Sequence, residues 1–448
     1  MKKLLIGLLA MAACSPKETT QIPMKDIQLI TLDPGHFHAA LVQKKMYDAI
    51  DSTVHIYAPP GLDLALHMAK INGYNDRVDS PTAWKSEIYE SDDFFEKMIS
   101  DKAGNVVVMA GNNAKKTDYI YKTIDAGFSV LADKPMVIDP ADYDKLKEAF
   151  EIAKEKNILL YDIMTERSEI TTVLQKALSQ QKELFGELIT GTLEEPAVTK
   201  ESVHHYFKYV SGSPLIRPSW FFDTKQQGEG IVDVTTHLVD LTFWECFPEQ
   251  VIKESDVELK AAKRWSTDLT LAQFQKVTGA TAYPDFLAND VKGDKLEVYA
   301  NGEIDYTING HYAKVSVIWN YEAPEGTGDT HYSIMRGTKA NLVIQQTAAE
   351  NYKPTLYIES KGELTNEEVS AVLKEIAIKY PGVSVTSMGD KWKVEIPEEY
   401  NIGHEAHFGQ VMERFIDYYQ HGNMPAWEVP NMLTKYKLTT DALKMATK

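Results

Sequence analysis

The chain has 448 residues, more than one compact hydrophobic core usually supports, so two domains are predicted. Hydrophobic residues make up 44% and charged residues 25%, a composition typical of a folded globular protein rather than a disordered one. The formal net charge of −18 argues against nucleic-acid binding, because it repels phosphate backbones and no arginine cluster offsets it.

The first residues are predicted to form an export signal and a polar tether, over residues 1–23. Two lysines precede an apolar run (4–11), which leads into Ala12, Ala13 and Cys14. The run is much shorter than the ~20 residues that a membrane-spanning helix needs. Residues 11–14 resemble a bacterial lipobox, which implies cleavage before Cys14, lipidation of its sulfur, and a periplasmic or cell-surface lipoprotein. An ordinary secretory signal is the alternative.

Residues 24–163 alternate short apolar strands with helices. The pattern predicts strands over 27–32, 54–58, 105–110, 128–132 and 158–161, and helices over 39–46, 117–126 and 142–156. Such alternation is typical of right-handed βαβ units, and continuous apolar strands indicate burial on both faces. We therefore expect an N-terminal α/β domain with a Rossmann-like, doubly wound parallel sheet.

Residues 164–448 follow a different pattern. Strand-like runs over 188–193, 295–299 and 313–320 are separated by loops, and Val315, Val317 and Trp319 recur at every second position. That alternation suits an antiparallel sheet with one exposed face. Amphipathic helices are expected over 404–420 and 431–447. The second domain is predicted to be α+β, with an open, mostly antiparallel sheet.

The first strand runs into a turn that stands where a dinucleotide-binding domain carries Gly-x-Gly-x-x-Gly. Only the middle glycine is kept, as Gly35, where the missing side chain lets the backbone approach a pyrophosphate. A plain strand-to-helix turn is the alternative. After the second strand, the residue that binds ribose is expected to be acidic, but the first acid is Asp63, so NAD and NADP are both open. The candidate cofactor contacts in these two loops are Pro34, Gly35, His36, Phe37, His38 and Ala58.

The pair His36 and His38 invites a metal-site interpretation. No carboxylate or cysteine cluster follows nearby in the sequence to complete a ligand set. Apart from Cys14, the only cysteine is Cys246, so neither an internal disulfide nor a cysteine-based metal site is expected. We predict no metal, and we expect the two histidines to cap the turn or contact phosphate.

The most informative segment is the strand that ends in Asp133, Lys134 and Pro135. Ligands of open α/β sheets bind at the carboxyl edge, where such residues lie. A lysine there can hydrogen-bond a substrate hydroxyl and stabilise alkoxide charge as hydride leaves. A surface lysine in an ordinary turn is the alternative.

This segment resembles the Gfo/Idh/MocA family of sugar and polyol oxidoreductases, in which it usually reads Glu-Lys-Pro. Residues 110–113 resemble the family loop along the nicotinamide ribose, which implies cofactor contacts from Asn112, Asn113, Asp133 and Lys134. The turn at 33–38 is similar to that of an exported Bacteroidetes-type subgroup. The resemblance implies a nicotinamide cofactor, NAD or NADP.

The family also carries a glycine-rich stretch followed by Asp-x-x-x-His about 100 residues further on. Here Gly228 and Gly230 precede Asp233 and His237, which are four residues apart and would share a helical face. The resemblance implies catalytic roles for Lys134, Asp233 and His237. The histidine would serve as general base, and the aspartate would orient it or bind a neighbouring hydroxyl. A core-packed helix with one satisfied histidine is the alternative.

Aromatic faces and planar donors suit a sugar ring, although each such residue could also be purely structural. The candidate substrate contacts are Glu166, Arg167, His205, Tyr206, Arg217, Trp220, Asp233 and His237.

We therefore predict an enzyme that transfers hydride between a nicotinamide cofactor and a secondary hydroxyl of a sugar or glycoside, with C3 as the expected position. Export predicts a tightly bound cofactor that is recycled in place. One alternative is an NAD-dependent glycosidase or lyase that oxidises C3 transiently, and another is a non-catalytic sugar-binding lipoprotein. A small sugar or glycoside is the expected partner, membrane contact is expected only through the lipid, and pairing of open sheets could give a homo-oligomer.

Overall fold

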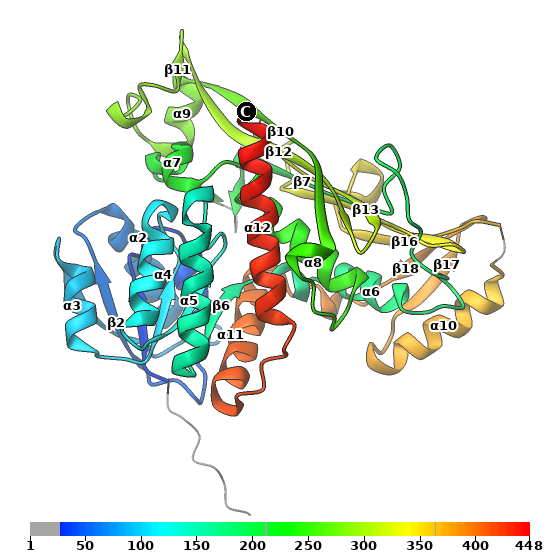
Figure 1. Ribbon diagram of the computed structural model, residues 1–448, viewed down its shortest axis with the longest axis horizontal. Helices are drawn as coiled ribbons and strands as arrows, with labels where there is room; N and C mark the ends of the chain where they lie inside the picture. Colours follow the sequence, from blue (N-terminus) through cyan, green and yellow to red (C-terminus); the bar gives the residue numbers. More distant parts are fainter. Residues whose placement is uncertain (1–26, 211–212, 363) are drawn as a thin grey trace, which may run out of the picture.

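The computed structural model describes residues 27–210, 213–362 and 364–448. The predicted leader, tether and Cys14 lie outside the described residues, so the lipid anchor stays a prediction. Within the described ranges, no helix is both long enough and apolar enough to cross a membrane. Figure 1 shows two sheets side by side, with the final helices between them.

The first sheet has six parallel strands in the order β3-β2-β1-β4-β5-β6. They are β1 (Leu29–Leu32), β2 (Thr53–Ala58), β3 (Lys85–Glu90), β4 (Val106–Met109), β5 (Ser129–Asp133) and β6 (Leu160–Ile163). The helices between them are α1 (His38–Leu41), α2 (Leu62–Asp76), α3 (Phe94–Asp101), α4 (Lys116–Asp125) and α5 (Tyr143–Lys156). Every residue of β1, β4 and β5 is buried, as their apolar runs indicated. The predicted Rossmann-like sheet is confirmed.

Several features of this half differ from the prediction, which included neither α2 nor α3 nor β3. The edge strand β3 is polar and largely exposed, so it carries no apolar signal from which it could be predicted. The helix expected over 39–46 is wrong in length, because α1 ends at Leu41. Beyond it the ammonium groups of Lys44 and Lys45 bind Glu405 and Glu413, far along the chain.

The second sheet has ten strands in the order β10-β12-β13-β7-β14-β15-β16-β18-β17, with β11 paired to β12. They are β7 (Val198–Phe207), β10 (Val257–Thr270), β11 (Val291–Lys292), β12 (Lys295–Ile308), β13 (His311–Glu322), β14 (Thr330–Arg336), β15 (Ala340–Gln345), β16 (Thr355–Ser360), β17 (Ser384–Ser387) and β18 (Lys391–Glu395). Its strands pair antiparallel except for β7 and β13. The predicted open, mostly antiparallel sheet is confirmed.

The strand predicted over 188–193 is wrong. Leu188 and Gly191 form only isolated bridges, and Gly191 turns the chain with a φ of 70°. A side chain at Gly191 would lie 2.4 Å from the backbone nitrogen of Ala197, so the turn requires glycine. A short two-stranded ribbon, β8 (Tyr209–Val210) and β9 (Ser213–Pro214), follows β7.

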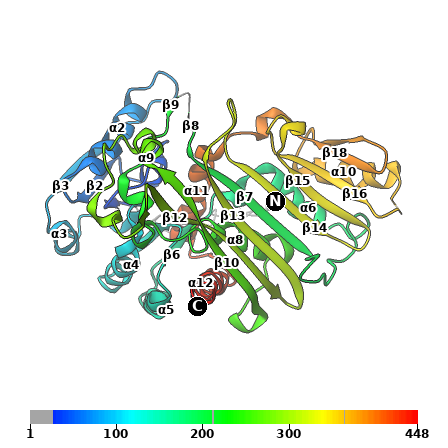
Figure 2. The same ribbon diagram turned by 90° about the horizontal axis from the view of Figure 1, so that it is seen from above.

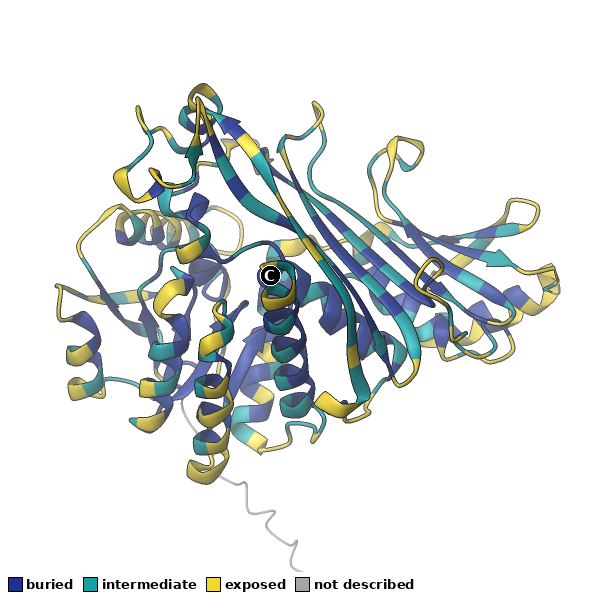
Figure 3. Cartoon of the chain, turned by 45° about the horizontal axis from the view of Figure 1, so that its top comes forward, coloured by how far each residue is buried: buried dark blue, intermediate teal, exposed yellow. Residues whose placement is uncertain are grey.

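Helices cover one face of the large sheet, as the view in Figure 2 shows for α6 and α8. The helices of this half are α6 (Ile170–Ser179), α7 (Thr224–Gln227), α8 (Thr235–Cys246), α9 (Leu271–Thr278) and α10 (Asn366–Lys379). Buried positions run along both sheets and the helices that face them (Figure 3).

The last two helices, α11 (His404–His421) and α12 (Glu428–Ala446), return to the first sheet. Phe408 and Tyr436 belong to the hydrophobic core of that sheet, whereas Leu438 on α12 belongs to the core of the second sheet. The final helices therefore bind the two halves together. The boundary expected after residue 163 stays a prediction.

Candidate active site

Lys134 and Asp233 form a buried ion pair where the first sheet meets the second domain. The Nζ of Lys134 lies 2.6 Å from Oδ1 of Asp233, and Gln227 donates through Nε2 to Oδ2 at 3.0 Å. Burial lowers the pKa of Lys134, but Asp233 and Asp133 outweigh it, so the pKa is raised overall. Burial raises the pKa of Asp233, and Lys134 more than reverses that effect. The pair is therefore ammonium and carboxylate near neutral pH.

The glycine-rich stretch positions Asp233 by packing tightly against β12. A side chain at Gly230 would lie 1.7 Å from the carbonyl oxygen of Ala300, so only glycine fits. The helix α8 begins at Thr235, which leaves Asp233 in the preceding turn. The predicted helical face shared by Asp233 and His237 is therefore wrong, and the carboxylate of Asp233 binds Lys134 instead.

His237 lies in the first turn of α8. Its Nδ1 is buried and has no hydrogen-bond partner in the structure. Burial, followed by the charge of Lys134, lowers the pKa of His237 to about 3. The imidazole is therefore neutral at pH 7 and can accept a proton.

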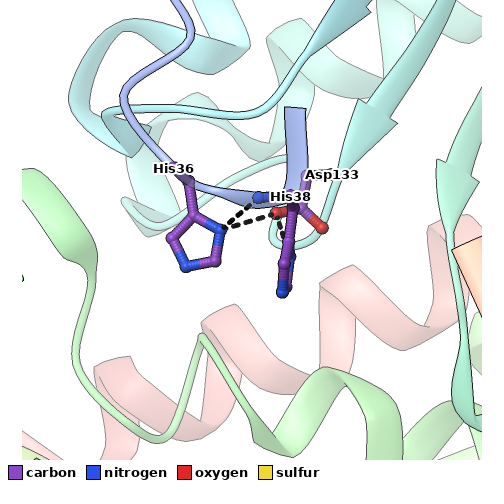
Figure 4. A group of neighbouring side chains, drawn as sticks. All are labelled: His36, His38 and Asp133. Carbon is purple, nitrogen blue, oxygen red and sulfur yellow. Dashed lines mark hydrogen bonds and ion pairs between the residues drawn. The ribbon is translucent and has the colours of Figure 1, made fainter. Parts of the chain in front are cut away.

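His36 and His38 turn toward the carboxylate of Asp133 (Figure 4). The Nδ1 of His38 lies 2.8 Å from Oδ2 of Asp133, and the Nδ1 of His36 lies 3.8 Å from the same oxygen. The backbone N–H of His38 donates to Nδ1 of His36 at 3.3 Å. Lys116 donates through Nζ to the backbone oxygen of Asp133 at 3.1 Å. Burial and then His38 lower the pKa of His36, burial and then His404 lower the pKa of His38, and Lys134 lowers both further.

A pocket of about 290 Å³ opens at the carboxyl ends of β1 and β2. Its lining includes Pro34, Ala58, Pro60, Asp63, Trp220 and Phe286, so residues of both domains enclose it. The Nε1 of Trp220 donates to Oδ2 of Asp63 at 3.0 Å. A side chain at Gly35 would lie 3.0 Å from that same oxygen and 3.2 Å from the ring of Trp220, so the space beside Gly35 is tight.

The pocket fits the adenosine end of a dinucleotide. Its walls are largely apolar, and the carboxylates of Asp33 and Asp63 can accept hydrogen bonds from ribose hydroxyls. Burial and then Asp63 raise the pKa of Asp33 to about 6, so the two carboxylates affect each other. Of the predicted cofactor contacts, Pro34 and Ala58 line this pocket.

Asn112 and Asn113 tie the loop after β4 to the second domain. Asn112 donates through Nδ2 to Oε1 of Gln226 at 2.7 Å, and Asn113 donates to the backbone oxygen of Gln227 at 2.7 Å. Their amide N–H groups therefore hold the segment that leads to Asp233. Phe37 precedes α1, and its ring lies beside the Lys70 ammonium.

Two more of the predicted substrate residues are Glu166 and Trp220. Glu166 has Oε1 3.6 Å from Nε2 of His404. Burial raises the pKa of Glu166, but the charges of His404, His331 and His237 lower it to about 2 overall. Trp220 lines the pocket at the carboxyl ends of β1 and β2.

Four other predicted substrate residues make interior contacts of their own, and their substrate roles stay predictions. Arg167 is buried, and its guanidinium binds Asp240 and Glu428. Arg217 donates to the backbone oxygens of Tyr206 and His205 and stacks on aromatic rings. The ring of Tyr206 packs against Phe222 and Trp319, and His205 lines a separate cavity. The structure uses these four side chains for packing and interior bonds.

Sequence reasoning missed several residues of the site. Gln227 could have been found, because it immediately precedes the glycine-rich stretch. Lys116 and His404 could not, since no spacing relates them to the motifs. Their places follow from the packing of α4 and α11 at the edge of the first sheet.

Comparison with known proteins gives two matching family models. Residues 67–162 match "Oxidoreductase family, NAD-binding Rossmann fold", and residues 174–447 match "Putative oxidoreductase C terminal domain". The search of curated proteins gave no match. The first half therefore carries an NAD-binding Rossmann fold.

Solved structures extend the comparison over the whole chain. A "putative oxidoreductase" from Parabacteroides merdae is 54% identical, with a TM-score of 0.92 over 95% of this chain and 98% of that one. Levoglucosan dehydrogenase has 14% identity and a TM-score of 0.60 over 95% of this chain and 97% of its own. A 3-ketoreductase from Actinomadura kijaniata, in complex with NADP, has 12% identity and a TM-score of 0.57, over 94% and 98%. At such low identity, the last two show a shared fold.

Proposed function

The chain belongs to the Gfo/Idh/MocA family of oxidoreductases, and we propose that it transfers hydride between a nicotinamide cofactor and a secondary hydroxyl of a sugar or glycoside. The observation that carries this proposal is the buried Lys134–Asp233 pair, with a Nζ to Oδ1 distance of 2.6 Å, next to the neutral His237. A charged donor and an unprotonated acceptor in one buried site suit the oxidation of an alcohol.

Lys134 and His237 have different roles in the proposed reaction. Lys134 donates a hydrogen bond to the substrate oxygen and stabilises its negative charge, while Asp233 and Gln227 hold the ammonium in place. His237 is neutral at pH 7 but, with a pKa of about 3, only weakly basic, so it takes up the hydroxyl proton as the hydride leaves, when that proton is most acidic. A bound nicotinamide would supply the hydride acceptor. In the reverse direction, His237 returns the proton to the carbonyl oxygen.

The pocket at β1 and β2 favours NAD over NADP in this proposal. Asp33 and Asp63 are among its lining residues, and none of the residues that line it is Lys or Arg. A 2′-phosphate in this pocket would meet two carboxylates, and no cation lines the pocket to pair with it. Trp220 and Phe286 of the second domain also enclose this pocket, which supports a retained cofactor. Retention suits the export that the leader predicts.

The proposed substrate class rests on the chemistry of the candidate site and on neighbours that share the fold. Neighbours with the same fold include a levoglucosan dehydrogenase, also solved with NADH and L-sorbose, and a 3-ketoreductase solved with NADP. We extend that chemistry to this chain and propose C3 of a hexose unit as the reacting carbon.

The test begins with dialysed, denatured protein, from which released nucleotide is identified by mass. We expect NAD or NADH near one equivalent. Absence of nucleotide, together with no binding of added NAD, would leave a sugar-binding protein as the better description. The protein is then incubated with 4-nitrophenyl β-glucoside. A 3-keto product supports the dehydrogenase, whereas nitrophenol release without a keto product favours the glycosidase.

Lys134→Met should lower turnover by roughly 100-fold or more.

A further inference from the structure

We propose that His36, His38 and Asp133 bind one divalent transition-metal ion of the kind that prefers imidazole, such as Zn²⁺ or Co²⁺. Each residue offers one ligand atom, and these atoms lie within 4.8 Å of one another. The side chains come from the turn after β1 and from the end of β5, and they point at a common space (Figure 4). This metal site does not depend on the proposed hydride transfer.

The distances suit a small ion with few protein ligands. Bonds of about 2.0–2.2 Å in a tetrahedral arrangement separate ligand atoms by roughly 3.3 Å. Oδ2 of Asp133 lies 2.8 Å from Nδ1 of His38 and 3.8 Å from Nδ1 of His36, so these separations lie on either side of that value. Small side-chain rotations would equalise them. Two imidazoles and one carboxylate leave a fourth position open to water or a ligand oxygen, as in catalytic sites.

Hydrogen bonding alone explains only part of the cluster. His38 and Asp133 can share a proton between Nδ1 and Oδ2. The Nδ1 of His36 accepts the backbone N–H of His38 at 3.3 Å with its one lone pair, so a metal would take that lone pair in place of this long hydrogen bond. The Nδ1 of His36 and Oδ2 of Asp133 are 3.8 Å apart, too far to share a proton, and a metal ion would bridge them.

The nearby ammonium groups are already engaged. Lys134 is paired with Asp233, and Lys116 binds the backbone oxygen of Asp133 rather than its carboxylate. Among the described residues, His36 and His38 are the side chains paired with that carboxylate.

The donor set also selects the kind of ion. Mg²⁺ and Ca²⁺ prefer oxygen ligands, whereas two imidazole nitrogens with one carboxylate suit zinc and its first-row neighbours. Co²⁺ is the useful probe, because its visible absorption reports both binding and coordination geometry.

The experiment titrates CoCl₂ into tag-free, chelator-treated protein, once without nucleotide and once with NAD. We expect one equivalent bound in at least one state, with a visible band typical of four or five ligands. Loss of one ligand should weaken binding by roughly 10- to 100-fold or more, so His38→Ala and Asp133→Asn are compared with wild type. His36→Gln is a milder third variant, in case burial makes the others unstable.

The matched control is His421→Ala. His421 is exposed on α11 and pairs with Asp417 through Nδ1 and Oδ1 at 3.0 Å. The variant therefore removes an imidazole–carboxylate pair elsewhere in the molecule. We expect it to bind Co²⁺ like wild type. No stoichiometric binding in either state, or equal binding by folded His36→Gln, would show that the cluster is held by hydrogen bonds alone. Because no turnover is measured, that result would leave the hydride-transfer proposal intact.

Discussion

At the scale of single residues, partners decide what each candidate side chain can do. Lys134 would lose its proton more easily if it were only buried, but Asp233 reverses that effect. Asp233 in turn owes its low pKa to Lys134. Burial, followed by the charge of Lys134, keeps His237 neutral by lowering its pKa. The donor and the acceptor of the proposed reaction therefore differ in charge at the same pH.

Asp233→Asn should move the alkaline limit of turnover to lower pH. Without that carboxylate, burial dominates and the pKa of Lys134 falls, so the ammonium form is lost sooner as pH rises. We expect kcat at pH 7 to fall by about 10- to 100-fold, and the alkaline limb to shift by about one unit or more. The measurement is kcat against pH with the glycoside substrate.

The control for this variant is Asp142→Asn, which removes the carboxylate of an exposed pair with Lys145. Its pH profile should match that of wild type. An alkaline limb that stays in place in Asp233→Asn would contradict the role given to the ion pair.

At the scale of elements, helix α2 carries a buried titratable group that no bond satisfies. Both ring nitrogens of His67 are buried without a hydrogen-bond partner in the structure. Burial lowers the pKa of His67 from 6.5 to about 4. Because the unfolded chain binds the proton first as pH falls, this residue destabilises the fold below about pH 6.5 and has little effect on pH dependence above it.

His67→Leu should therefore reduce the sensitivity of the fold to acid. Between pH 7 and pH 5, wild type loses roughly 2 kcal/mol through this residue, at 1.36 kcal/mol per pKa unit, and the variant should not. Urea unfolding at both pH values measures the difference. His421→Leu, at the exposed end of α11, is the control and should keep the wild-type loss. If His67→Leu loses as much unfolding free energy between pH 7 and pH 5 as wild type, His67 does not cause the acid sensitivity of the fold.

At the scale of the whole molecule, a buried charge network joins β6, α8 and α12. Lys435 binds Asp162 at 2.6 Å and Asp240 at 3.0 Å, and Arg167 joins Asp240 to Glu428. These residues come from the first sheet, the helix after Asp233 and the last helix. The network thus fixes the second domain against the edge where Lys134 lies.

Lys435→Met should destabilise the protein by about 3–5 kcal/mol, because it leaves two buried carboxylates without their shared cation. Lys437→Met, on the same helix, removes a partly exposed pair with Asp441 and should cost less than about 1 kcal/mol. Chemical unfolding of both variants gives the comparison. Similar small losses in the two would show that the buried network adds little to the union of the domains.

The sequence by itself determined the features that depend on neighbouring residues. Apolar runs and turns predicted the parallel sheet, alternation predicted the antiparallel one, and short motifs predicted Lys134, Asp233 and His237 as one candidate site. The tertiary structure alone decided which side chains meet. It paired Asp233 with Lys134 instead of His237, buried Arg167 between Asp240 and Glu428, and brought Asp133 to His38 across 95 residues. Spacing along a chain fixes local geometry, but contacts between distant segments depend on how whole elements pack.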